Sequence, residues 1–323
     1  MSLFPQFASD ATTDVSVVVV SYNTKHLLER MLTALDAGRG QLQLQIIVVD
    51  NASKDDSAAF LKREFPHVEL IENPTNVGFG RANNQALSSV RGRYVLLLNT
   101  DAFVSPDTLP RTVNYMDEHP RSGVLGVKLI DESGVLQPSC FHFPTPWNIF
   151  LRMSRLDRFF KSGRLFNEDH ESLRACDWVK GCYYLMRREI TETIGLFDPR
   201  YFLYYEEVDH CRRVHEAGWD VIYYPHAPVV HIGAESAKSY NKPLDRNRQV
   251  SILHIESELL YLRKHHGMFG LMASVLLTMM ADVGLVLKRV VLREKKQVKE
   301  PLSHARLIIK LLVDTKLASR PTR

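Results

Sequence analysis

The chain has 323 residues, of which 45% are hydrophobic and 24% are charged, and its formal net charge is +4. These values are typical of a soluble globular protein and exclude a disordered chain, a collagen-like repeat and a polytopic membrane protein. The length predicts about two domains, or one large α/β domain with an appendage. The four cysteines lack CxxC spacing, which argues against a disulfide framework and a zinc site. Residues 1–14 contain no Lys, no Arg and no long apolar run, so we expect no signal peptide and a cytoplasmic location.

The charge is distributed unevenly along the chain. Residues 288–323 contain 11 Lys and Arg against 3 Asp and Glu, a balance of +8, so the remaining 287 residues carry −4. A basic tail on a slightly acidic body predicts an anionic surface as a partner, and a membrane is the obvious one. A solvated basic helix at the terminus would have the same charge, so both interpretations stay open.

The first two-thirds of the chain alternates between predicted strands and helices. Apolar runs at 15–20, 46–49, 68–71 and 94–98 predict buried parallel strands. Between them we expect a helix that begins after Thr24 and ends at Gly38 or Gly40, a short helix at 57–65, and a loop leading into a helix at 76–90. This alternation predicts a doubly wound α/β sheet with ligands at the carboxyl ends of its strands.

From about Ser122 the pattern changes. Residues 124–137 predict a hairpin with its turn at 131–134, and 177–187 predict a strand in which Gly181 permits a close backbone approach. Helices are expected at 190–197 and 206–218, and a further strand at 221–224. The stretch 147–166 mixes Arg with large apolar residues, which is typical of an amphipathic, mobile segment.

Residues 268–287 are twenty mostly apolar positions, interrupted by Ser274, Thr278 and Asp282 and followed by Lys288 and Arg289. That length is enough to cross the hydrocarbon core of a bilayer, but Asp282 would be costly there. We favour a helix that lies in or dips into the cytoplasmic leaflet. A true span and a helix buried inside the protein are the alternatives.

Polar side chains follow three of the predicted strands: Ser21 and Asn23, Asp50 and Asn51, and Asn99 and Asp101. Carboxyl ends of parallel strands meet at one edge of a sheet, where ligands bind. The chain has no GxGxxG after its first strand and no GxxxxGK[ST], which disfavours a dinucleotide-dependent dehydrogenase and a P-loop NTPase.

Three features could carry chemistry, and each has a simpler structural explanation. Asp101 could hold a hard divalent cation on a diphosphate, although an Asp after a strand is more often a turn or cap residue. Glu206, Glu207 and Asp209 crowd like charge at a helix start, which raises the proton affinity of one of them as a general base requires. The helix dipole also explains acidic residues there. His231 would complete a ligand set for Mn²⁺ or Mg²⁺, yet a single His is usually a packed or surface residue.

Seven motifs, taken in order, make the chain resemble a known family. They are Ser21-Tyr22-Asn23, Val49-Asp50-Asn51-Ala52-Ser53, NVGFGRANN at 76–84, Leu98-Asn99-Thr100-Asp101, Trp178-Val179-Lys180-Gly181, Gly195-Leu196-Phe197-Asp198 and YYEEVD at 204–209. The set looks like the family 2 inverting glycosyltransferases of GT-A fold, and within them the bacterial rhamnosyltransferase-like enzymes of cell-surface polysaccharide assembly. The resemblance spans residues 14–235.

The resemblance implies an α/β fold of the GT-A type, a mixed Rossmann-like sheet with a C-terminal helical extension. It places a catalytic domain at 1–240, with a donor half at 14–121 and an acceptor half at 122–240. A helical, membrane-associating region would follow at 241–323.

The resemblance also implies roles for the matching positions. Asp50 would accept a hydrogen bond from the pyrimidine base of the donor. The other positions expected to bind the nucleotide are Ser21, Tyr22, Asn23, Asn51, Asn76, Gly78, Arg81, Asn84 and Asn99. Asp101 and His231 would hold a Mg²⁺ or Mn²⁺ ion on the diphosphate, and Trp178 and Gly181 would contact the acceptor.

Glu207 stands where the family usually has the second residue of a Glu-Asp pair, its catalytic base, and Glu206 and Asp209 belong to the same acidic cluster. The chain departs from the family pattern twice. Asn99 replaces the first aspartate of the usual Asp-x-Asp motif and leaves one charge for the metal. Glu207 is longer than Asp by one methylene, so Glu206 stays an alternative base.

These assignments predict metal-dependent, inverting transfer of a sugar, with L-rhamnose as the candidate, from a dTDP- or UDP-sugar. The acceptor would be a glycan or polyprenyl-linked molecule of the cell envelope, as in lipopolysaccharide assembly. We expect a peripheral enzyme at the inner face of the bacterial plasma membrane, with an anionic membrane surface and no nucleic acid as partners.

Two alternatives stay open. A catalytically silent GT-A domain could act as a sugar-binding or scaffolding module, which the substituted Asn99 and Glu207 would allow. A nucleotidyltransferase would need a Gly-rich phosphate loop after the first strand, and residues 21–24 are not such a loop.

Overall fold

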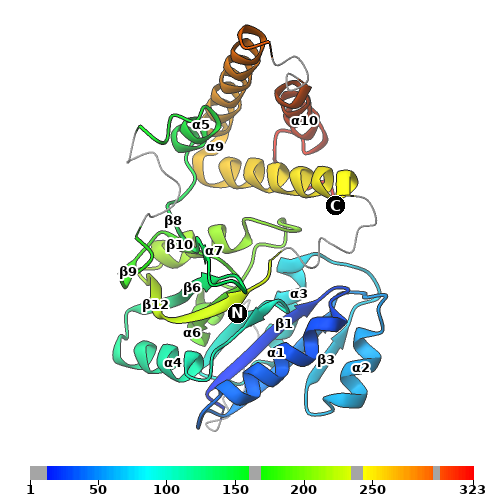
Figure 1. Ribbon diagram of the computed structural model, residues 1–323, viewed down its shortest axis with the longest axis vertical. Coiled ribbons are helices and arrows are strands. Elements are labelled where there is room, and N and C mark those ends of the chain that lie inside the picture. The colour runs from blue at the N-terminus through cyan, green and yellow to red at the C-terminus, as the bar shows by residue number, and fades with distance from the viewer. Residues whose placement is uncertain (1–12, 160–168, 234–242, 294–298) are drawn as a thin grey trace, which may run out of the picture. The chain divides into compact units, whose positions relative to one another are not determined.

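The computed structural model describes residues 13–159, 169–233, 243–293 and 299–323 (Figure 1). The chain divides into two compact units, the first formed by 1–141, 168–199 and 206–246 and the second by 142–167, 200–205 and 247–323. The expected domain boundary at residue 240 and the donor and acceptor halves stay predictions. Of the expected amphipathic segment 147–166, residues 160–166 lie outside the described residues.

The first unit is an α/β structure. Its helical elements are α1 (Lys25–Gly38), α2 (Ser57–Glu64), α3 (Phe79–Ala86), the 3₁₀ turn η1 (Leu87–Ser89), α4 (Thr108–Glu118), α6 (Arg188–Thr193) and α7 (Glu206–Glu216). Its strands are β1 (Val15–Ser21), β2 (Leu44–Asp50), β3 (Glu69–Glu72), β4 (Tyr94–Leu98), β5 (Ala102–Phe103), β6 (Ser122–Ile130), β7 (Leu136–Gln137), β8 (Cys140–Phe141), β9 (Arg174–Ala175), β10 (Trp178–Val179), β11 (Tyr183–Arg187) and β12 (Asp220–His231).

The main sheet has the strand order β3-β2-β1-β4-β11-β6-β12-β5, with β7 paired to β6 and β9 to β12. Strands β1 to β4 are mutually parallel where they pair, whereas β11 runs antiparallel to both β4 and β6. In the register of β1 and β2, Ser21 lies opposite Asp50. The polar side chains predicted at the ends of these two strands therefore lie at the same edge of the sheet. The hairpin predicted at 124–137 is confirmed as β6 and β7.

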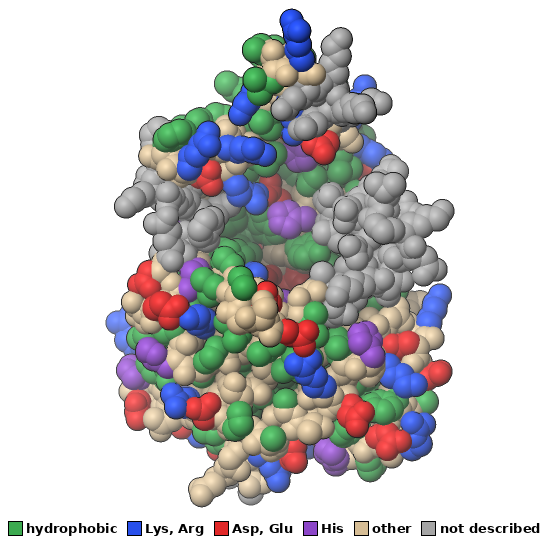
Figure 2. All heavy atoms as spheres, viewed as in Figure 1, with side chains coloured by type: hydrophobic (Ala, Val, Ile, Leu, Met, Phe, Trp, Pro, Cys, Tyr) green, Lys and Arg blue, Asp and Glu red, His purple; other side chains and the backbone are tan. Residues whose placement is uncertain are grey.

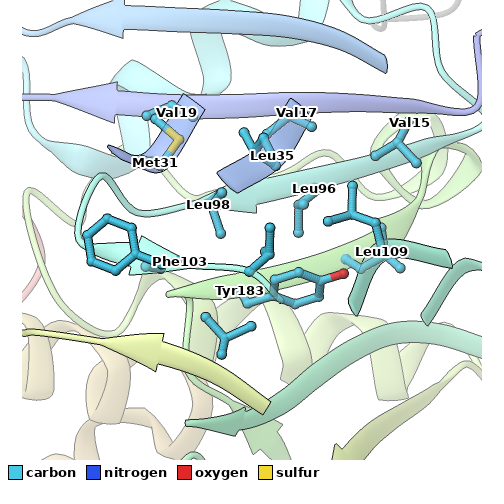
Figure 3. Packing of buried hydrophobic residues seen from close by; sticks show 14 of the residues in the cluster. Val15, Val17, Val19, Met31, Leu35, Leu96, Leu98, Phe103, Leu109 and Tyr183 are labelled. Carbon is cyan, nitrogen blue, oxygen red and sulfur yellow. The ribbon is translucent and has the colours of Figure 1, made fainter. Parts of the chain in front are cut away.

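One face of the sheet packs against α1 and α4. Alternate residues of β1 point to this face, and Val17 and Val19 lie beside Leu35 and Met31 of α1 (Figure 3). The apolar stripe of α1 is buried as its sequence periodicity requires: Leu27, Leu28, Met31, Leu32 and Leu35. Apolar residues of β4, β11 and α4 complete the same core.

The opposite face of the sheet holds α7 through buried polar contacts. Tyr183 belongs to the apolar core, so the next residue of β11, Tyr184, points to the other face. Its hydroxyl lies 2.8 Å from Nδ1 of His210 in α7, and Nε2 of the same ring lies 3.2 Å from the carbonyl oxygen of Gly195. Both Tyr184 and His210 are fully buried. These contacts fix the acidic start of α7 relative to the sheet.

Two sequence-based expectations about the strands differ from the structure. The single strand expected at 177–187 is two strands in different sheets, because Trp178–Val179 pairs with β8 and Tyr183–Arg187 joins the main sheet. The break between them holds Lys180 and Gly181. The strand expected at 221–224 continues to His231, where it pairs with Ala102 of β5. The first difference places Lys180 and Gly181, and the second places His231, at the edge of the sheet where the strands end.

The second unit is helical. It contains α5 (Pro146–Met153), most of α9 (Pro243–Val291) and α10 (Lys299–Asp314). Gly267 interrupts α9 with φ of 67° and ψ of −171°, a conformation that favours glycine. Ile252–Val291 is long and apolar enough to cross a membrane by length and composition. The mean hydropathy of its 18-residue window is 2.0, and 33% of that window is buried.

Replacing Leu35 by Ala should destabilise the first unit. The side chain of Leu35 is fully buried in the core under β1, so the variant loses apolar burial and leaves a cavity. We expect a loss of about 2–5 kcal/mol in the free energy of unfolding, measured by denaturant titration. Leu173→Ala is the matched control, because Leu173 is 40% exposed. Equal losses in the two variants would contradict this description of the core.

Candidate active site

The loops that follow β1 and β2 are bound to each other. Asn23, with φ of 54°, accepts a hydrogen bond from the Lys54 amide at Oδ1 over 2.7 Å. Its own amide donates to the Ser53 hydroxyl over 2.9 Å. Ser21 is buried beside this loop, whereas Tyr22 is partly exposed. The structure therefore joins the first two predicted nucleotide-binding motifs into one surface.

Asp50 has one carboxylate oxygen that is not hydrogen-bonded within the described part of the chain. The residue is 4% exposed, and its Oδ2 accepts a hydrogen bond from the Ser53 amide over 3.0 Å. Its Oδ1 is buried, and no group in the described ranges forms a hydrogen bond with it. Leaving a buried charged acceptor unsatisfied is costly, so a donor from a ligand is the natural partner for this atom.

Asn51 and Asn76 shape the loop at 76–78. The Asn51 amide group donates to Asn76 Oδ1 over 2.9 Å, and Asn51 Oδ1 accepts from the Val77 amide over 3.0 Å. Asn76 Oδ1 also accepts from the Gly78 amide, and Gly78 has φ of 90°, which requires glycine. These bonds hold the loop against the end of β2. The direct contacts predicted between these residues and the nucleotide stay predictions.

Arg81 and Asn84 of α3 bind backbone atoms of the segment before α7. Arg81 Nε donates to the Pro199 carbonyl oxygen over 2.8 Å. Asn84 bonds the backbone of Phe197 twice, to its carbonyl oxygen over 2.7 Å and from its amide over 3.0 Å. In this geometry both side chains position the turn at 197–199. Their predicted role toward the nucleotide stays a prediction.

Asp101 and His231 lie side by side. The imidazole Nε2 of His231 is 3.5 Å from Asp101 Oδ1, and the Gly233 amide donates to Asp101 Oδ2 over 3.1 Å. Asp101 is 6% and His231 8% exposed. The pairing of β12 with β5 produces this contact between residues 130 positions apart. Asn99 is held through its backbone, which bonds to Cys182 and Ala102.

The chemistry of this pair fits a divalent cation that also binds a substrate. Two octahedral ligands about 2.1 Å from Mg²⁺, at right angles, are about 3 Å apart, close to the observed separation. Within the described ranges no group of three or more His, Cys, Asp or Glu side chains could hold a metal ion. A pair of protein ligands suits Mg²⁺ or Mn²⁺, which commonly take their remaining ligands from phosphate oxygens and water.

Burial lowers the pKa of His231, and the nearby positive charge of Lys180 acts in the same direction, whereas the carboxylate of Asp101 opposes the shift. The imidazole is therefore neutral at pH 7. A neutral ring keeps a lone pair on one nitrogen, which a metal ligand must have.

Glu207 lies at the start of α7, opposite Gly181. A Cβ atom at Gly181 would be 3.9 Å from Glu207 Cβ, so glycine leaves room beside this carboxyl group. Burial raises the pKa of Glu207, and bonds from backbone amides, including that of Gly181, and the charge of Lys180 partly oppose the rise. A raised pKa suits a group that must accept a proton near neutral pH.

The backbone just before α7 is strained. Tyr204 and Tyr205 have φ of 73° and 69°, values that are uncommon for bulky residues. Such strain costs on the order of 1–3 kcal/mol per residue and gathers at functional sites. It sets the direction in which α7 and its acidic residues begin.

The other two acidic residues of the cluster are more deeply buried. Glu206 is 3% exposed and Asp209 is fully buried. Asp209 accepts a hydrogen bond from Arg213 Nε over 2.9 Å, and Arg213 also donates to the Ile194 carbonyl oxygen. The ion pair lies within α7, and the bond from Arg213 to Ile194 ties this helix to the segment before it. Catalytic roles for Glu206 and Asp209 stay predictions.

Of the expected acceptor residues, Trp178 lies in β10 and Gly181 lies in the break between β10 and β11. The Trp178 ring stacks on Phe141 of β8 with centroids 4.3 Å apart. This contact lies within the small second sheet, where Trp178 is opposite Phe141. Contact of either residue with an acceptor stays a prediction.

The sequence analysis missed two residues of this site. The positive charge of Lys180 lowers the pKa of both Glu207 and His231, so it acts on the expected base and on one expected metal ligand. Its place in the Trp178–Gly181 motif was the available signal. Gln137, on the hairpin strand β7, forms two hydrogen bonds with His231. Nothing in the local sequence indicated that contact, because the partners are 94 positions apart.

Comparison with known proteins identifies the family of this site. Residues 16–195, more than half of the chain, match the profile of glycosyl transferase family 2. The chain belongs to this family. It is a glycosyltransferase, and the predicted resemblance is confirmed.

Two relatives of this family 2 glycosyltransferase have described activities. The N-acetylglucosaminyl-diphospho-decaprenol L-rhamnosyltransferase of Mycobacterium tuberculosis is 28% identical over 253 residues, which cover 69% of this chain and 78% of the relative. The rhamnosyltransferase WbbL of Escherichia coli is 26% identical over 236 residues, covering 70% of this chain and 86% of the relative.

Solved structures confirm the α/β GT-A fold. The mannosyltransferase PcManGT of Pyrobaculum calidifontis, in complex with GDP-Man and Mn²⁺, matches with a TM-score of 0.55 at 17% identity. The match covers 97% of this chain and 90% of that one. GalNAc-T7 with UDP, GalNAc and Mn²⁺ matches with a TM-score of 0.53 at 14% identity, covering 79% of this chain and 48% of that one.

The raised pKa of Glu207 has a consequence for stability. Above the ordinary pKa of 4.5 the unfolded chain releases the proton that the folded glycosyltransferase still holds, so stability falls as pH rises toward the folded pKa. Glu207→Gln removes this loss. We expect the variant to gain stability relative to the parent protein between pH 4 and pH 7, measured by urea unfolding at both values.

Asp209→Asn is the control for that measurement. It leaves the partly buried Arg213 without its carboxylate partner, so at pH 7 it should lose about 3 kcal/mol or more. A relative loss of stability in Glu207→Gln as the pH rises would contradict the burial that we describe for Glu207.

Proposed function

We propose that this glycosyltransferase moves L-rhamnose from a pyrimidine-nucleotide diphosphate sugar, with inversion, to a lipid-linked glycan acceptor. The observation that carries the proposal is the unsatisfied Oδ1 of Asp50, which lies at the edge of the sheet where β1 and β2 end. The choice of rhamnose and of a lipid-linked acceptor rests on the names of the two relatives.

The Asp50 oxygen suits the N3–H group of uracil or thymine. Ser53 already satisfies Oδ2, so only Oδ1 is left to receive a donor from the ligand. Cytosine has no hydrogen on N3, so an acceptor here selects between pyrimidines. Ser21 lies opposite Asp50 in the strand register, and Ser53, which bonds Asp50, also accepts a hydrogen bond from the Asn23 amide.

We propose that Asp101 and His231 hold a Mg²⁺ or Mn²⁺ ion on the diphosphate. When bound, the ion would neutralise the charge that develops on the leaving nucleoside diphosphate. The Gly233 amide holds one carboxylate oxygen of Asp101, which leaves the other directed at His231. The structural neighbours solved with Mn²⁺ support this assignment.

Glu207 is proposed as the base that takes the proton of the acceptor hydroxyl. The raised pKa of Glu207 suits it to accept a proton. Its position beside Gly181 leaves room for a hydroxyl group to approach. Attack from the side opposite the leaving diphosphate inverts the configuration at the anomeric carbon, and no covalent glycosyl-enzyme is formed.

Two variants test the nucleotide site and the catalytic base separately. In Asp50→Asn the Ser53 amide still needs an acceptor, so the side-chain NH₂ replaces Oδ1 and faces the N3–H as a second donor. We expect this variant to lose the thermal stabilisation that dTDP or UDP with Mn²⁺ gives the parent protein. That stabilisation is about 2.7 kcal/mol at 100 times the dissociation constant.

Glu207→Gln is the reciprocal control. It should keep the nucleotide-induced shift in melting temperature and lose about 100-fold or more in turnover with a sugar nucleotide and a polyprenyl-linked acceptor. GDP and CMP serve as nucleotides without the matching N3–H arrangement. No shift with any nucleotide in the folded parent protein would instead support a silent GT-A domain, and near-normal turnover in Glu207→Gln would refute the assignment of the base.

The α9 segment after Gly267 has reversed amphipathicity. Its buried face includes polar side chains, Ser274, Thr278 and Asp282, together with apolar ones. Asp282 Oδ2 lies 2.8 Å from Nδ1 of His304 in α10, so the two helices pair through one buried and one partly buried polar group. The exposed face is apolar: Phe269, Met272, Leu276, Met280, Val283 and Leu287. A helix that packs in water normally shows the opposite pattern.

We propose that this exposed apolar face rests in the cytoplasmic leaflet of a membrane. The polar pair of Asp282 and His304 binds α9 to α10, and α10 carries the exposed basic residues Arg306 and Lys310. Hydrophobic and basic side chains occur together over this part of the chain on the face shown in Figure 2. Apolar insertion with basic residues around it is the pattern of a helix that lies in an anionic interface. This position would bring the enzyme to a lipid-linked acceptor.

Leu276→Glu should weaken membrane binding. It places a charge in the centre of the apolar face, and we expect about a tenfold or larger loss in co-sedimentation with vesicles that contain phosphatidylglycerol. Val135→Glu is the matched control, since Val135 and Leu276 are each 61% exposed and Val135 lies in the first unit. Unchanged binding of Leu276→Glu, or equal losses in both variants, would argue against this face as the membrane contact.

A further inference from the structure

Gln137 forms two hydrogen bonds with a single residue, His231. Its Nε2 donates to the backbone carbonyl oxygen of His231 over 2.7 Å, and its Oε1 lies 2.7 Å from the imidazole Nδ1 of the same residue. Gln137 is partly buried on β7, opposite Leu129 of β6. A single side chain therefore contacts both the backbone and the ring of a residue at the end of β12.

The chemical groups in the two hydrogen bonds determine which atom is the donor in each. A backbone carbonyl oxygen can only accept, so the end of Gln137 that faces it must be the NH₂ group. The other end is then the amide oxygen, which can only accept. The nitrogen of His231 that faces this oxygen must therefore carry the hydrogen. The assignment follows from the backbone carbonyl and holds whichever way the amide is first drawn.

This arrangement of donor and acceptor determines that Nε2 of His231, and not Nδ1, carries the lone pair when the ring is neutral. In a neutral imidazole with hydrogen on Nδ1, Nε2 carries the lone pair. That atom lies 3.5 Å from Asp101 Oδ1, while Gly233 holds Asp101 Oδ2. The opposite tautomer would set the lone pair of Nδ1 against the oxygen of Gln137 and direct Nε2–H at Asp101, so that the two would satisfy each other.

We propose that Gln137 is a positioning residue that fixes the tautomer and ring orientation of His231, so that Nε2 and Asp101 both offer lone pairs to one cation. The role toward the cation rests on the proposed function, whereas the tautomer itself does not. Partners of this kind behind a metal-binding histidine typically change metal affinity by about 10–100-fold when they are removed.

The register of the β6–β7 hairpin places Gln137 where it can contact His231. Gln137 pairs with Leu129, and Leu129 is in turn opposite Val229 of β12. Shifting β7 by one residue would turn the Gln137 side chain to the other face of the hairpin. The hairpin therefore supplies a site residue from outside the motifs that resemble the family.

The tautomer can be read directly by NMR in the protein without metal. Long-range ¹H–¹⁵N correlation spectra of the ¹⁵N-labelled full chain distinguish the two neutral forms, and a His231→Gln spectrum assigns the resonance. We expect hydrogen on Nδ1 in the parent protein and a shift toward the Nε2–H form in Gln137→Leu. Gln137→Glu keeps an acceptor and should keep hydrogen on Nδ1.

Two controls separate tautomer control from general disruption of the hairpin. His119 Nδ1 lies 2.8 Å from the carbonyl oxygen of Tyr115, so its tautomer is an internal reference that should not change in any variant. Leu136→Ala alters the neighbouring strand position and should leave His231 with hydrogen on Nδ1. If Gln137→Leu fails to fold, Gln137→Ala takes its place.

The second readout is Mn²⁺ affinity, measured by electron paramagnetic resonance with dTDP or UDP present. Gln137→Leu should bind Mn²⁺ about 10–100-fold more weakly than the parent protein. Hydrogen that stays on Nδ1 in Gln137→Leu would overturn the proposal, and so would a changed tautomer with unchanged Mn²⁺ affinity. A parent protein that binds no Mn²⁺ with either nucleotide would refute the cation in the proposed function, and the NMR result would still decide whether Gln137 sets the tautomer.

Discussion

The parallel register of β1 with β2 and β4 is the constraint on which the site depends. It places Ser21 opposite Asp50, and it brings the loop after β4, with Asp101, to the same edge. Because side chains of a strand alternate between faces, a slip of one residue would turn Asp50 toward the opposite face. The apolar core under β1 fixes this register, since Val17 and Val19 must both stay buried (Figure 3). Core packing and ligand binding are therefore two results of one alignment.

Local patterns predicted the elements whose burial is local. The β-branched run at 15–20 and the apolar stripe of α1 each indicated the observed element, because one strand and one helix face are buried along their whole length. The division of 177–187 into two strands could not be predicted in this way. It depends on which partners the two halves find, β8 for one and β4 with β6 for the other. The same holds for the contact between Gln137 and His231, which are 94 positions apart in the sequence.

Residue type alone also fails to separate ligand contacts from internal ones. Arg81 and Asn84 are polar residues in a motif that resembles a nucleotide site, yet the structure uses both to bind carbonyl oxygens at 197–199. Asp50 has the same polar character, but its Oδ1 has no hydrogen-bond partner among the residues that the structure describes. In α9 the sequence showed twenty mostly apolar positions, whereas the structure shows which of them face outward. Exposure and hydrogen-bond satisfaction are tertiary properties, and they decide function here.

Several costs to stability fall along the edge of the sheet and at the start of α7. Asp50 has an unsatisfied oxygen, Glu207 is a partly buried carboxyl group with a raised pKa, and Tyr204 and Tyr205 have strained backbones. A folded protein keeps such features only when other interactions outweigh them. Each cost also corresponds to a part of the proposed reaction. Asp50 would bind the pyrimidine of the donor, Glu207 would accept the proton, and the strained backbone directs the start of α7. The exposed apolar face of α9 follows the same logic, because it is unfavourable in water and favourable at the membrane that would hold the acceptor.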